Sequence, residues 1–174
     1  MYCYLSFFIT RGESVSELST TARKRLYGDD NILGDRVDMQ ILTKIGGAEY
    51  DLVNGEFVNA KNGLAKFSSD HRKLLREAKI ILDTIANNNH ITQKEIKRLL
   101  IPCFQATGFD GELMVLKLFA PGLYSAQYMG SVTIPDHVSQ LKLLRKKALP
   151  RLFYIKVKSL FTLLYFFPFQ HLRK

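Results

Sequence analysis

The last 38 residues of the sequence lack any acidic side chain. His137–Lys174 contains nine Lys or Arg residues and no Asp or Glu, whereas the whole chain holds 25 basic and 16 acidic residues. Residues 1–136 therefore carry 16 residues of each sign, and the formal net charge of +9 belongs to the C-terminal segment. Charge separated in this way is typical of a surface that contacts a polyanion, either nucleic acid or an anionic membrane.

Other absences narrow the class of protein. The two cysteines, Cys3 and Cys103, match no metal-binding spacing, which favours free thiols in a reducing compartment over a disulfide. No Asn-x-Ser/Thr site occurs, and Met1–Thr10 lacks the basic start of a signal peptide. The apolar stretch Leu160–Phe169 has only ten residues, about half of what a membrane-spanning helix needs. We expect a cytoplasmic protein that can lie on a membrane but does not cross one.

Catalytic signatures are also missing. The four histidines are at least 19 residues apart and none lies near a cysteine, which disfavours a metal site. The sequence contains no glycine-rich phosphate-binding loop. We expect no enzymatic activity, no metal and no cofactor.

Short apolar runs bounded by turn residues predict strands. Asn54-Gly55 is the strongest hairpin signal, because this dipeptide suits a two-residue turn between antiparallel strands. Leu113–Phe119 is either a strand or a short buried segment, and Pro121-Gly122 is a turn. The other predicted strands are Tyr4–Thr10, Val37–Ile45, Tyr50–Val53, Glu56–Val58 and an extended segment over Tyr124–Ile134.

Apolar residues at helical spacing predict four helices. The strongest prediction is Asp70–Ala86, with Ser68-Ser69 as candidate caps and an apolar stripe along one face. Thr92 and Glu95 have the spacing of a capping box. The other predicted helices are Ser14–Tyr27, stopped by Gly28, a helix from Thr92 to about Leu100, and one from Asp136 to Leu149, ended by Pro150.

This order of elements predicts an α+β fold. We expect a single domain with a small, mostly antiparallel sheet and several packed helices. The domain covers residues 1–150, and residues 151–174 form a basic, aromatic C-terminal segment that packs on the same domain.

The basic residues of the C-terminal segment are the candidate nucleic-acid contacts. On a helix over residues 137–149, Val138, Leu141, Leu144 and Ala148 are expected to face the core, while several cations project together. Phosphate contacts of this kind depend strongly on salt. The alternative is a basic surface without a ligand. The candidate nucleic-acid-binding residues are Lys142, Arg145, Lys146, Lys147 and Arg151.

Aromatic residues interleaved with lysines follow that cluster. They suit base stacking or a lipid headgroup layer, and packing in the core is an equal alternative. The candidate membrane-contact residues are Lys156, Lys158, Phe161, Tyr165 and Phe166.

Ile80–Leu100 resembles the first two helices of winged-helix DNA-binding domains. The resemblance covers a helix, a short polar turn and a Thr-capped second helix. A recognition helix would follow, but Ile101–Gly111 contains a proline and two glycines. This resemblance implies, as an alternative function, a transcriptional regulator that reads a DNA sequence.

The whole chain resembles the matrix proteins of rhabdoviruses, particularly those of plant viruses. The resemblance rests on size, charge and the order of a strand (Tyr4–Ile9), a helix (Ser14–Tyr27) and a strand (Val37–Ile45). It departs from the animal-virus members, whose basic, proline-rich arm is N-terminal. The resemblance implies a self-associating structural protein that binds RNA or ribonucleoprotein and the inner face of the membrane, located in the virion and at membranes of the host cytoplasm.

Overall fold

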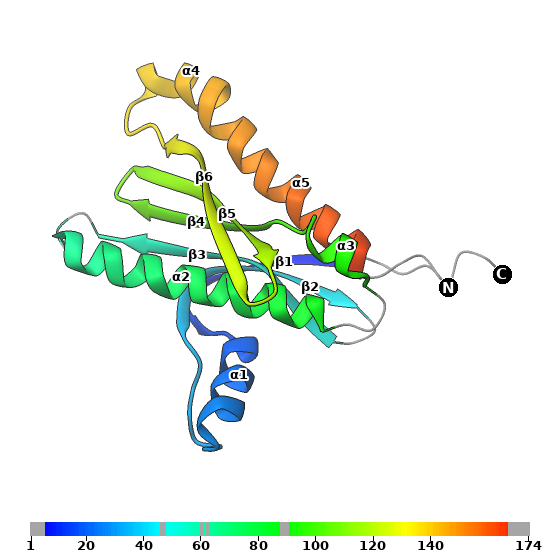
Figure 1. Cartoon of the computed structure of the whole chain (residues 1–174). Coiled ribbons are helices and arrows are strands. Elements are labelled where there is room, and N and C mark those ends of the chain that lie inside the picture. The colour runs from blue at the N-terminus through cyan, green and yellow to red at the C-terminus, as the bar shows by residue number, and fades with distance from the viewer. Residues whose placement is uncertain (1–5, 46–47, 60, 62, 88–90, 167–174) are drawn as a thin grey trace.

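The computed structural model describes residues 6–45, 48–59, 61, 63–87 and 91–166 (Figure 1). The strands are β1 (Ser6–Val15), β2 (Arg36–Ile45), β3 (Ala48–Val58), β4 (Ile101–Thr107), β5 (Asp110–Ala120) and β6 (Leu123–Thr133). The helices are α1 (Glu17–Tyr27), α2 (Gly63–Ala86), α3 (Gln93–Ile96), α4 (Leu141–Leu143) and α5 (Leu149–Phe166), together with the 3-10 turn η2 (Val138–Gln140) and the π-helical turn η3 (Leu144–Ala148).

The six described strands form one sheet in the order β1-β2-β3-β4-β5-β6. Every neighbouring pair is antiparallel except β3 and β4, which are parallel. Parallel neighbours require a crossover, and α2 and α3 supply it between the two strands. The predicted α+β fold with a mostly antiparallel sheet is confirmed.

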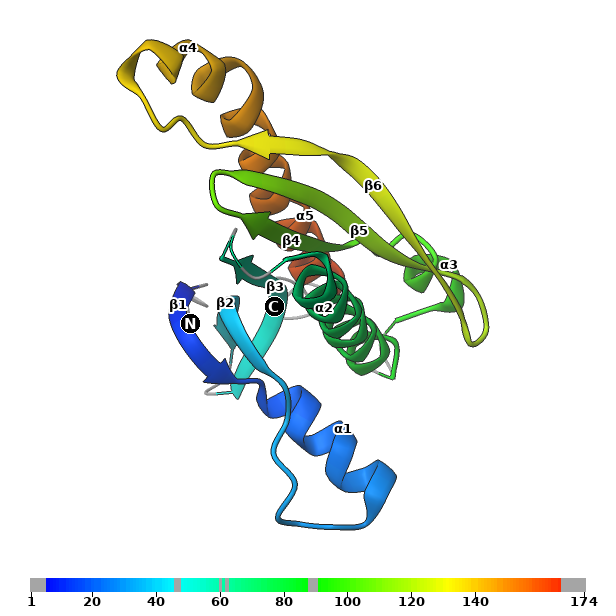
Figure 2. The same ribbon diagram turned by 90° about the vertical axis from the view of Figure 1, so that its left-hand side faces the viewer.

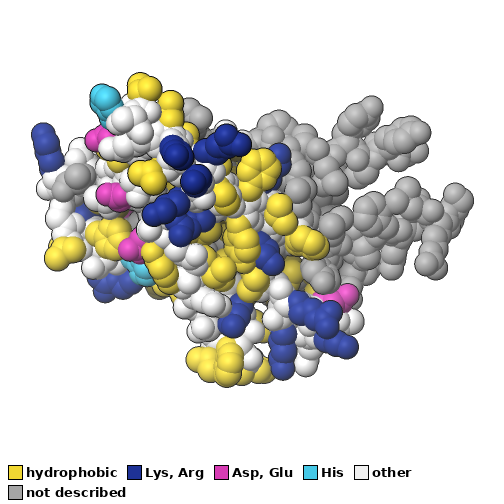
Figure 3. All heavy atoms as spheres, turned by 90° about the horizontal axis from the view of Figure 1, so that it is seen from above, with side chains coloured by type: hydrophobic (Ala, Val, Ile, Leu, Met, Phe, Trp, Pro, Cys, Tyr) yellow, Lys and Arg dark blue, Asp and Glu magenta, His cyan; other side chains and the backbone are white. Residues whose placement is uncertain are grey.

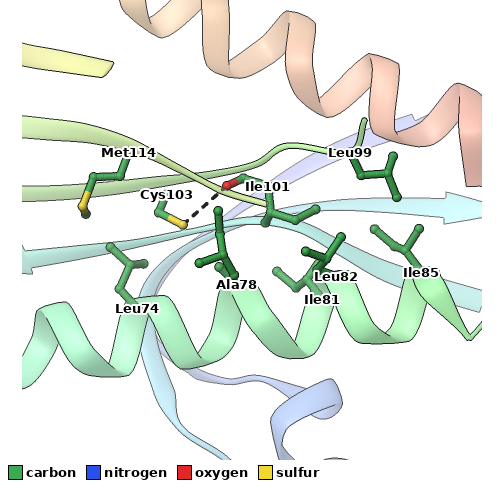
Figure 4. Packing of buried hydrophobic residues seen from close by; sticks show 10 residues of the cluster. Leu74, Ala78, Ile81, Leu82, Ile85, Leu99, Ile101, Cys103 and Met114 are labelled. Carbon is green, nitrogen blue, oxygen red and sulfur yellow. Dashed lines mark hydrogen bonds between the residues drawn. The ribbon is translucent and has the colours of Figure 1, made fainter. Parts of the chain in front are cut away.

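Helix α2 covers one face of the sheet. Its predicted apolar stripe is buried, and Leu74, Leu82 and Ile85 are at most 1% exposed. They pack against Ile101 and Cys103 of β4 (Figure 4). The helix begins earlier than predicted, at Gly63, so Ser68 and Ser69 are exposed helical residues and do not cap it.

Helix α5 lies on the opposite face of the sheet, so the centre of the molecule has three layers (Figures 1 and 2). A second core joins Ala148 and Ile155 to Leu52, Phe104 and Leu113 of the sheet. Alternate residues of β4 and β5 thus serve both cores, because successive side chains of a strand point to opposite faces. Helix α5 runs across residues 150 and 151, where the sequence suggested that a C-terminal segment begins.

The predicted hairpin at Asn54-Gly55 is wrong. Both residues lie inside β3, where Gly55 pairs with Met39 of β2 and with Phe104 of β4. A Cβ atom on Gly55 would stand 2.7 Å from Cε of Met39, so the end of the Met39 side chain would have to move to admit a larger residue. Gly46 and Gly47, which follow the predicted strand Val37–Ile45, lie outside the described residues.

The ends of the first two elements differ from the prediction. Strand β1 continues to Val15 through a register shift after Arg11, and Ser16 caps α1 by accepting a hydrogen bond from the backbone N–H of Ser19. Gly28 ends α1 in the left-handed conformation (φ 67°), as predicted. Helix α1 projects away from the three layers (Figure 2).

The described residues from Ile80 to Thr107 do not form a winged-helix arrangement. The capping box of Thr92 and Glu95 is present, but α3 has only four residues. The recognition helix would follow it, and Ile101–Thr107 is instead the buried strand β4. These described residues therefore offer no helix for a DNA groove.

Candidate interaction surface

The basic segment forms a continuous helical path from Val138 to the end of α5. We predicted that Pro150 would end a helix, and this prediction is wrong. A proline in an α-helix lacks an N–H and crowds the carbonyl four residues earlier. Just before Pro150 the turn widens, and the N–H of Leu149 donates to the carbonyl oxygen of Leu144, five residues back. This π-helical turn lets the helix continue through the proline.

Four cations project from this path into solvent. Their side chains are exposed, and the described residues provide them with no ion-pair partner. Figure 3, which looks onto α4 and α5, shows Lys and Arg side chains gathered there with hydrophobic side chains between them. We call these residues the four-cation cluster: Lys142, Arg145, Lys146 and Lys147.

Only two of the four residues that we expected to face the core from the helix over residues 137–149 do so. Leu144 and Ala148 pack in the second core, as expected. Val138 and Leu141 do not, because they are 76% and 52% exposed. The short turns η2 and α4 therefore carry apolar side chains in solvent beside the cations.

Arg151 behaves differently from the four-cation cluster. It is only partly exposed, and its Nη1 donates to the backbone carbonyl oxygen of Ser131 in β6. Its guanidinium lies so close to Gly130 that a Cβ there would be 2.7 Å from Nε. Arg151 therefore anchors α5 to the edge of the sheet, a role that the sequence did not indicate.

Helix α5 turns polar side chains toward the sheet. Ser159 and Thr162 are at most 2% exposed. Their hydroxyls donate to the carbonyl oxygens of Ile155 (2.8 Å) and Lys158 (3.0 Å), four residues earlier in the same helix. Hydroxyl groups satisfied in this way can be buried at little cost.

Apolar side chains occupy the opposite side of α5. Phe153 is 62% exposed, Phe161 52% and Val157 41%. Ordinary surface helices keep their apolar stripe on the face toward the core, whereas α5 has apolar side chains on both faces, since Ile155 packs in the second core. We call this set the outer face of α5: Leu149, Leu152, Phe153, Val157 and Phe161.

Two lysines border the outer face. Lys156 is exposed, and Lys158 lies over the rings of Tyr154 (5.3 Å) and Phe161 (5.8 Å). The side chains of Tyr165 and Phe166, also predicted to contact a membrane, lie outside the described residues. Together the four-cation cluster, the outer face of α5, Lys156 and Lys158 make up what we call the α4–α5 surface.

Arg98 adds a cation that sequence reasoning missed. This exposed residue precedes β4 and lines a shallow pocket of about 140 Å³ with Lys158, Phe161 and Thr162. It lies 60 residues from Lys158 in the sequence, and only the packing of α5 on the sheet brings the two cations to one pocket. No local pattern in the sequence signals this pairing.

Buried carboxyl groups form a separate polar region beneath α1 and α2. Burial raises the pKa of Glu56 to about 7, although Lys73 (2.7 Å) opposes the shift. Burial, and then a hydrogen bond with Asp35, raises the pKa of Glu77 to about 8. Burial is the largest influence on Asp35 and acts to raise its pKa, but hydrogen bonds with Arg76 and Glu77 and the charges of Arg76 and Arg23 together outweigh burial and lower the pKa. Within the described residues, these carboxyl groups do not gather with others into a group of three that could hold a metal ion.

Comparisons with protein-family models, curated proteins and solved structures found no match to this chain. None of the helices in the described ranges is both long and apolar enough to cross a bilayer. The arguments on function below therefore rest on the geometry of the α4–α5 surface.

Proposed function

We propose that this protein is a non-enzymatic, matrix-like structural protein that binds the anionic face of a membrane through the α4–α5 surface. One observation carries the proposal. Helix α5 presents its apolar side to solvent, next to cations that have no acidic partner among the described residues. A helix that lies in the lipid headgroup layer combines the same two features.

The energetics favour peripheral and reversible attachment. Completing the burial of Phe153, Val157 and Phe161 would contribute roughly 2–5 kcal/mol, since full burial of one such side chain is worth about 1.5–3 kcal/mol. Each cation near an anionic leaflet adds about 1 kcal/mol. Lys156 can reach the headgroups while its alkyl chain follows the apolar face. Both contributions are needed, so the affinity should fall in high salt.

RNA binding is a second candidate function. The four-cation cluster spans residues 142–147 and the outer face of α5 spans residues 149–161, so the cations are concentrated at one end of the surface. Phosphate contacts at that end would provide affinity without selecting a sequence. A protein with this layout can hold a ribonucleoprotein and a membrane with adjacent parts of one surface.

Liposome co-sedimentation tests the membrane proposal. The wild type should pellet with vesicles of phosphatidylcholine and phosphatidylserine, but not with phosphatidylcholine alone, and should be released by alkaline carbonate. The double substitution Phe153→Ser and Val157→Ser should reduce binding, because it removes apolar area from the outer face of α5. A matched control replaces two leucines elsewhere with serine, Leu26 of α1 and Leu64 of α2, which are more exposed than Phe153 and Val157, at 74% and 84%.

Three results would count against the proposal. Equal binding by the outer-face variant and the wild type would show that α5 does not face the lipid. Equal loss in the leucine control would indicate non-specific adsorption. Resistance to carbonate would mean integral insertion.

A further inference from the structure

Strand β6 is an open edge of the sheet. It pairs with β5 on one side, and no other described strand lies on its outer side. Its eleven residues, LYSAQYMGSVT, include no charged residue and no proline. Folded proteins usually protect such an edge with charges, prolines or bulges, because the unpaired N–H and C=O groups invite another strand.

The C-terminal half of this edge is protected. Tyr128 pairs with Met114 and Gly130 with Leu113, so Met129 is the extra residue of a bulge. Gly130 has φ of 138°, and Arg151 donates to the carbonyl oxygen of Ser131. The bulge and the arginine block continuous pairing there, whereas Tyr124–Tyr128, which lies between this bulge and the register shift after Leu118 of β5, has neither form of protection.

The opposite edge of the sheet is protected in its second half. Strand β1 contains Arg11 and Glu13, and its pairing with β2 shifts register between Arg11 and Ser14. Its first half, Ser6–Thr10, is uncharged and regularly paired, as the β6 stretch is. The variants described below therefore compare the two edges.

We infer that Tyr124–Tyr128 pairs, antiparallel, with the same segment of a second copy of this chain. Two copies of a chain with a net charge of +9 repel each other, so they can approach most closely along a strand that carries no charge, as β6 does. An antiparallel pair of identical strands is also self-complementary about a two-fold axis. The partner strand supplies the hydrogen bonds that the open edge lacks.

The pleat of the strand selects the register. Tyr124 faces α2, where its hydroxyl donates to Asp83, and Ala126 and Tyr128 follow on the same face of the sheet. Directly opposed residues of the two strands point to the same face of the sheet. By symmetry, the residue on the two-fold axis opposes the same residue of the second copy. With Ala126 on the axis, each Tyr124 opposes the partner's Tyr128, and this aromatic pair would cover a ring that is 58% exposed.

Such a dimer has a consequence for the proposed function. The two-fold axis of an antiparallel edge pair is perpendicular to the sheet, so both copies of α5 lie on the same side of the joined sheet. Two α4–α5 surfaces would then meet one membrane together and gain avidity. This consequence rests on the proposed membrane binding, whereas the pairing of β6 does not.

Analytical ultracentrifugation without lipid tests the pairing. The wild type should show a mass that rises with concentration toward twice that of the chain. Ala126→Lys should remain monomeric, because it places two like-charged side chains directly opposite each other at the axis, with their Cα atoms about 5.5 Å apart. The control Ile9→Lys puts the same charge on the other edge strand, at a side chain that is 61% exposed, and should still dimerise. Circular dichroism should show that both variants are folded.

Disulfide trapping provides a second measurement that does not depend on the lysine variant. In a Cys3→Ser background, Ala126→Cys should form a covalent dimer under mild oxidation, because Cα atoms about 5.5 Å apart allow a disulfide. Cys103 should not interfere, since it is buried and its pKa is raised to about 12. Ile9→Cys should remain monomeric.

The outcomes separate this inference from the membrane proposal. A monomeric wild type at all concentrations, a dimeric Ala126→Lys variant, or cross-linking at Ile9→Cys in place of Ala126→Cys would overturn the pairing. A wild type that dimerises through β6 but ignores anionic liposomes would overturn the proposed function and leave the pairing in place. Dimerisation of the wild type, together with weaker liposome binding by a monomeric Ala126→Lys variant, supports both the pairing and the proposed function.

Discussion

Replacing Glu77 with glutamine is expected to stabilise the protein at alkaline pH. Glu77 is 1% exposed, and Nδ2 of Asn54 donates to its Oε2 at 3.5 Å. Nearby, Asp35 accepts from Arg23 (2.5 Å) and Arg76 (2.7 Å), which favour its ionised form. Burial and the carboxylate of Asp35 together raise the pKa of Glu77 to about 8, so the folded protein keeps this side chain protonated at neutral pH.

The sign of the effect follows from proton uptake. The pKa of Glu77 is about 8 in the folded protein against 4.5 for an unperturbed glutamate, so folding binds a proton between these values. The contribution of Glu77 to the free energy of unfolding is therefore fully present below about pH 4.5 and is lost as the pH rises toward 8. The difference between these two pKa values corresponds to an upper bound of roughly 4–5 kcal/mol for this contribution. Because the site can relax and admit water, we expect about 2 kcal/mol.

The Glu77→Gln variant keeps the shape and a donor for Asp35 but cannot ionise. Urea unfolding at pH values from 4 to 9 should show similar free energies of unfolding for the variant and the wild type at the acid end. The variant should be more stable by about 2 kcal/mol at the alkaline end. A remaining slope is expected from Glu56, whose pKa is about 7. Glu112→Gln, a change of the same kind on a partly exposed side chain of β5, serves as the control. A variant with the same pH dependence as the wild type would refute the reasoning.

Three further predictions concern the core, the edge strand and the cations. Ile81→Ala should cost about 2–5 kcal/mol in a urea titration, because the side chain is 1% exposed beneath the sheet; a loss below roughly 1 kcal/mol would contradict its place in the core. Gly130→Ala should destabilise by about 1–3 kcal/mol, since φ is 138° and the new Cβ would meet Arg151; an unchanged melting temperature would mean that the bulge can relax. Alanine at all four positions of the four-cation cluster should weaken binding to unrelated RNAs equally and flatten the salt dependence of the affinity, as measured by gel shift at several salt concentrations. Unchanged affinity at every salt concentration would exclude the cluster as the phosphate contact.

Local sequence patterns correctly predicted those features whose physical cause lies within a single segment of the chain. The stripe of α2 repeats at helical spacing, and Leu74, Ile81 and Ile85 are buried as predicted. The capping box of Thr92 and Glu95 closes within four residues, and it is present. Charge separation is likewise a property of composition, and the exposed four-cation cluster follows from it.

Tertiary contacts decided the features that the sequence misled us about. Asn54-Gly55 has the local preference of a turn, but pairing with strands on both sides keeps it extended within β3. Pro150 has the local preference of a helix end, but the π-helical turn before it and the packing of Ala148 and Ile155 on the sheet allow the helix to continue. In each case a contact with a distant segment outweighed a preference of a few kcal/mol.

The orientation of α5 shows the limit of the sequence most clearly. The sequence determined that this helix is basic and aromatic, but its inward and outward sides could not be assigned from its composition. Ala148 and Ile155 pack in the second core, and Arg151 reaches the edge strand that lies 20 residues earlier, so Ser159 and Thr162 are buried on the sheet side of the helix. These contacts fix the rotation of the helix, and the rotation leaves Phe153, Val157 and Phe161 in solvent, where they can meet a membrane.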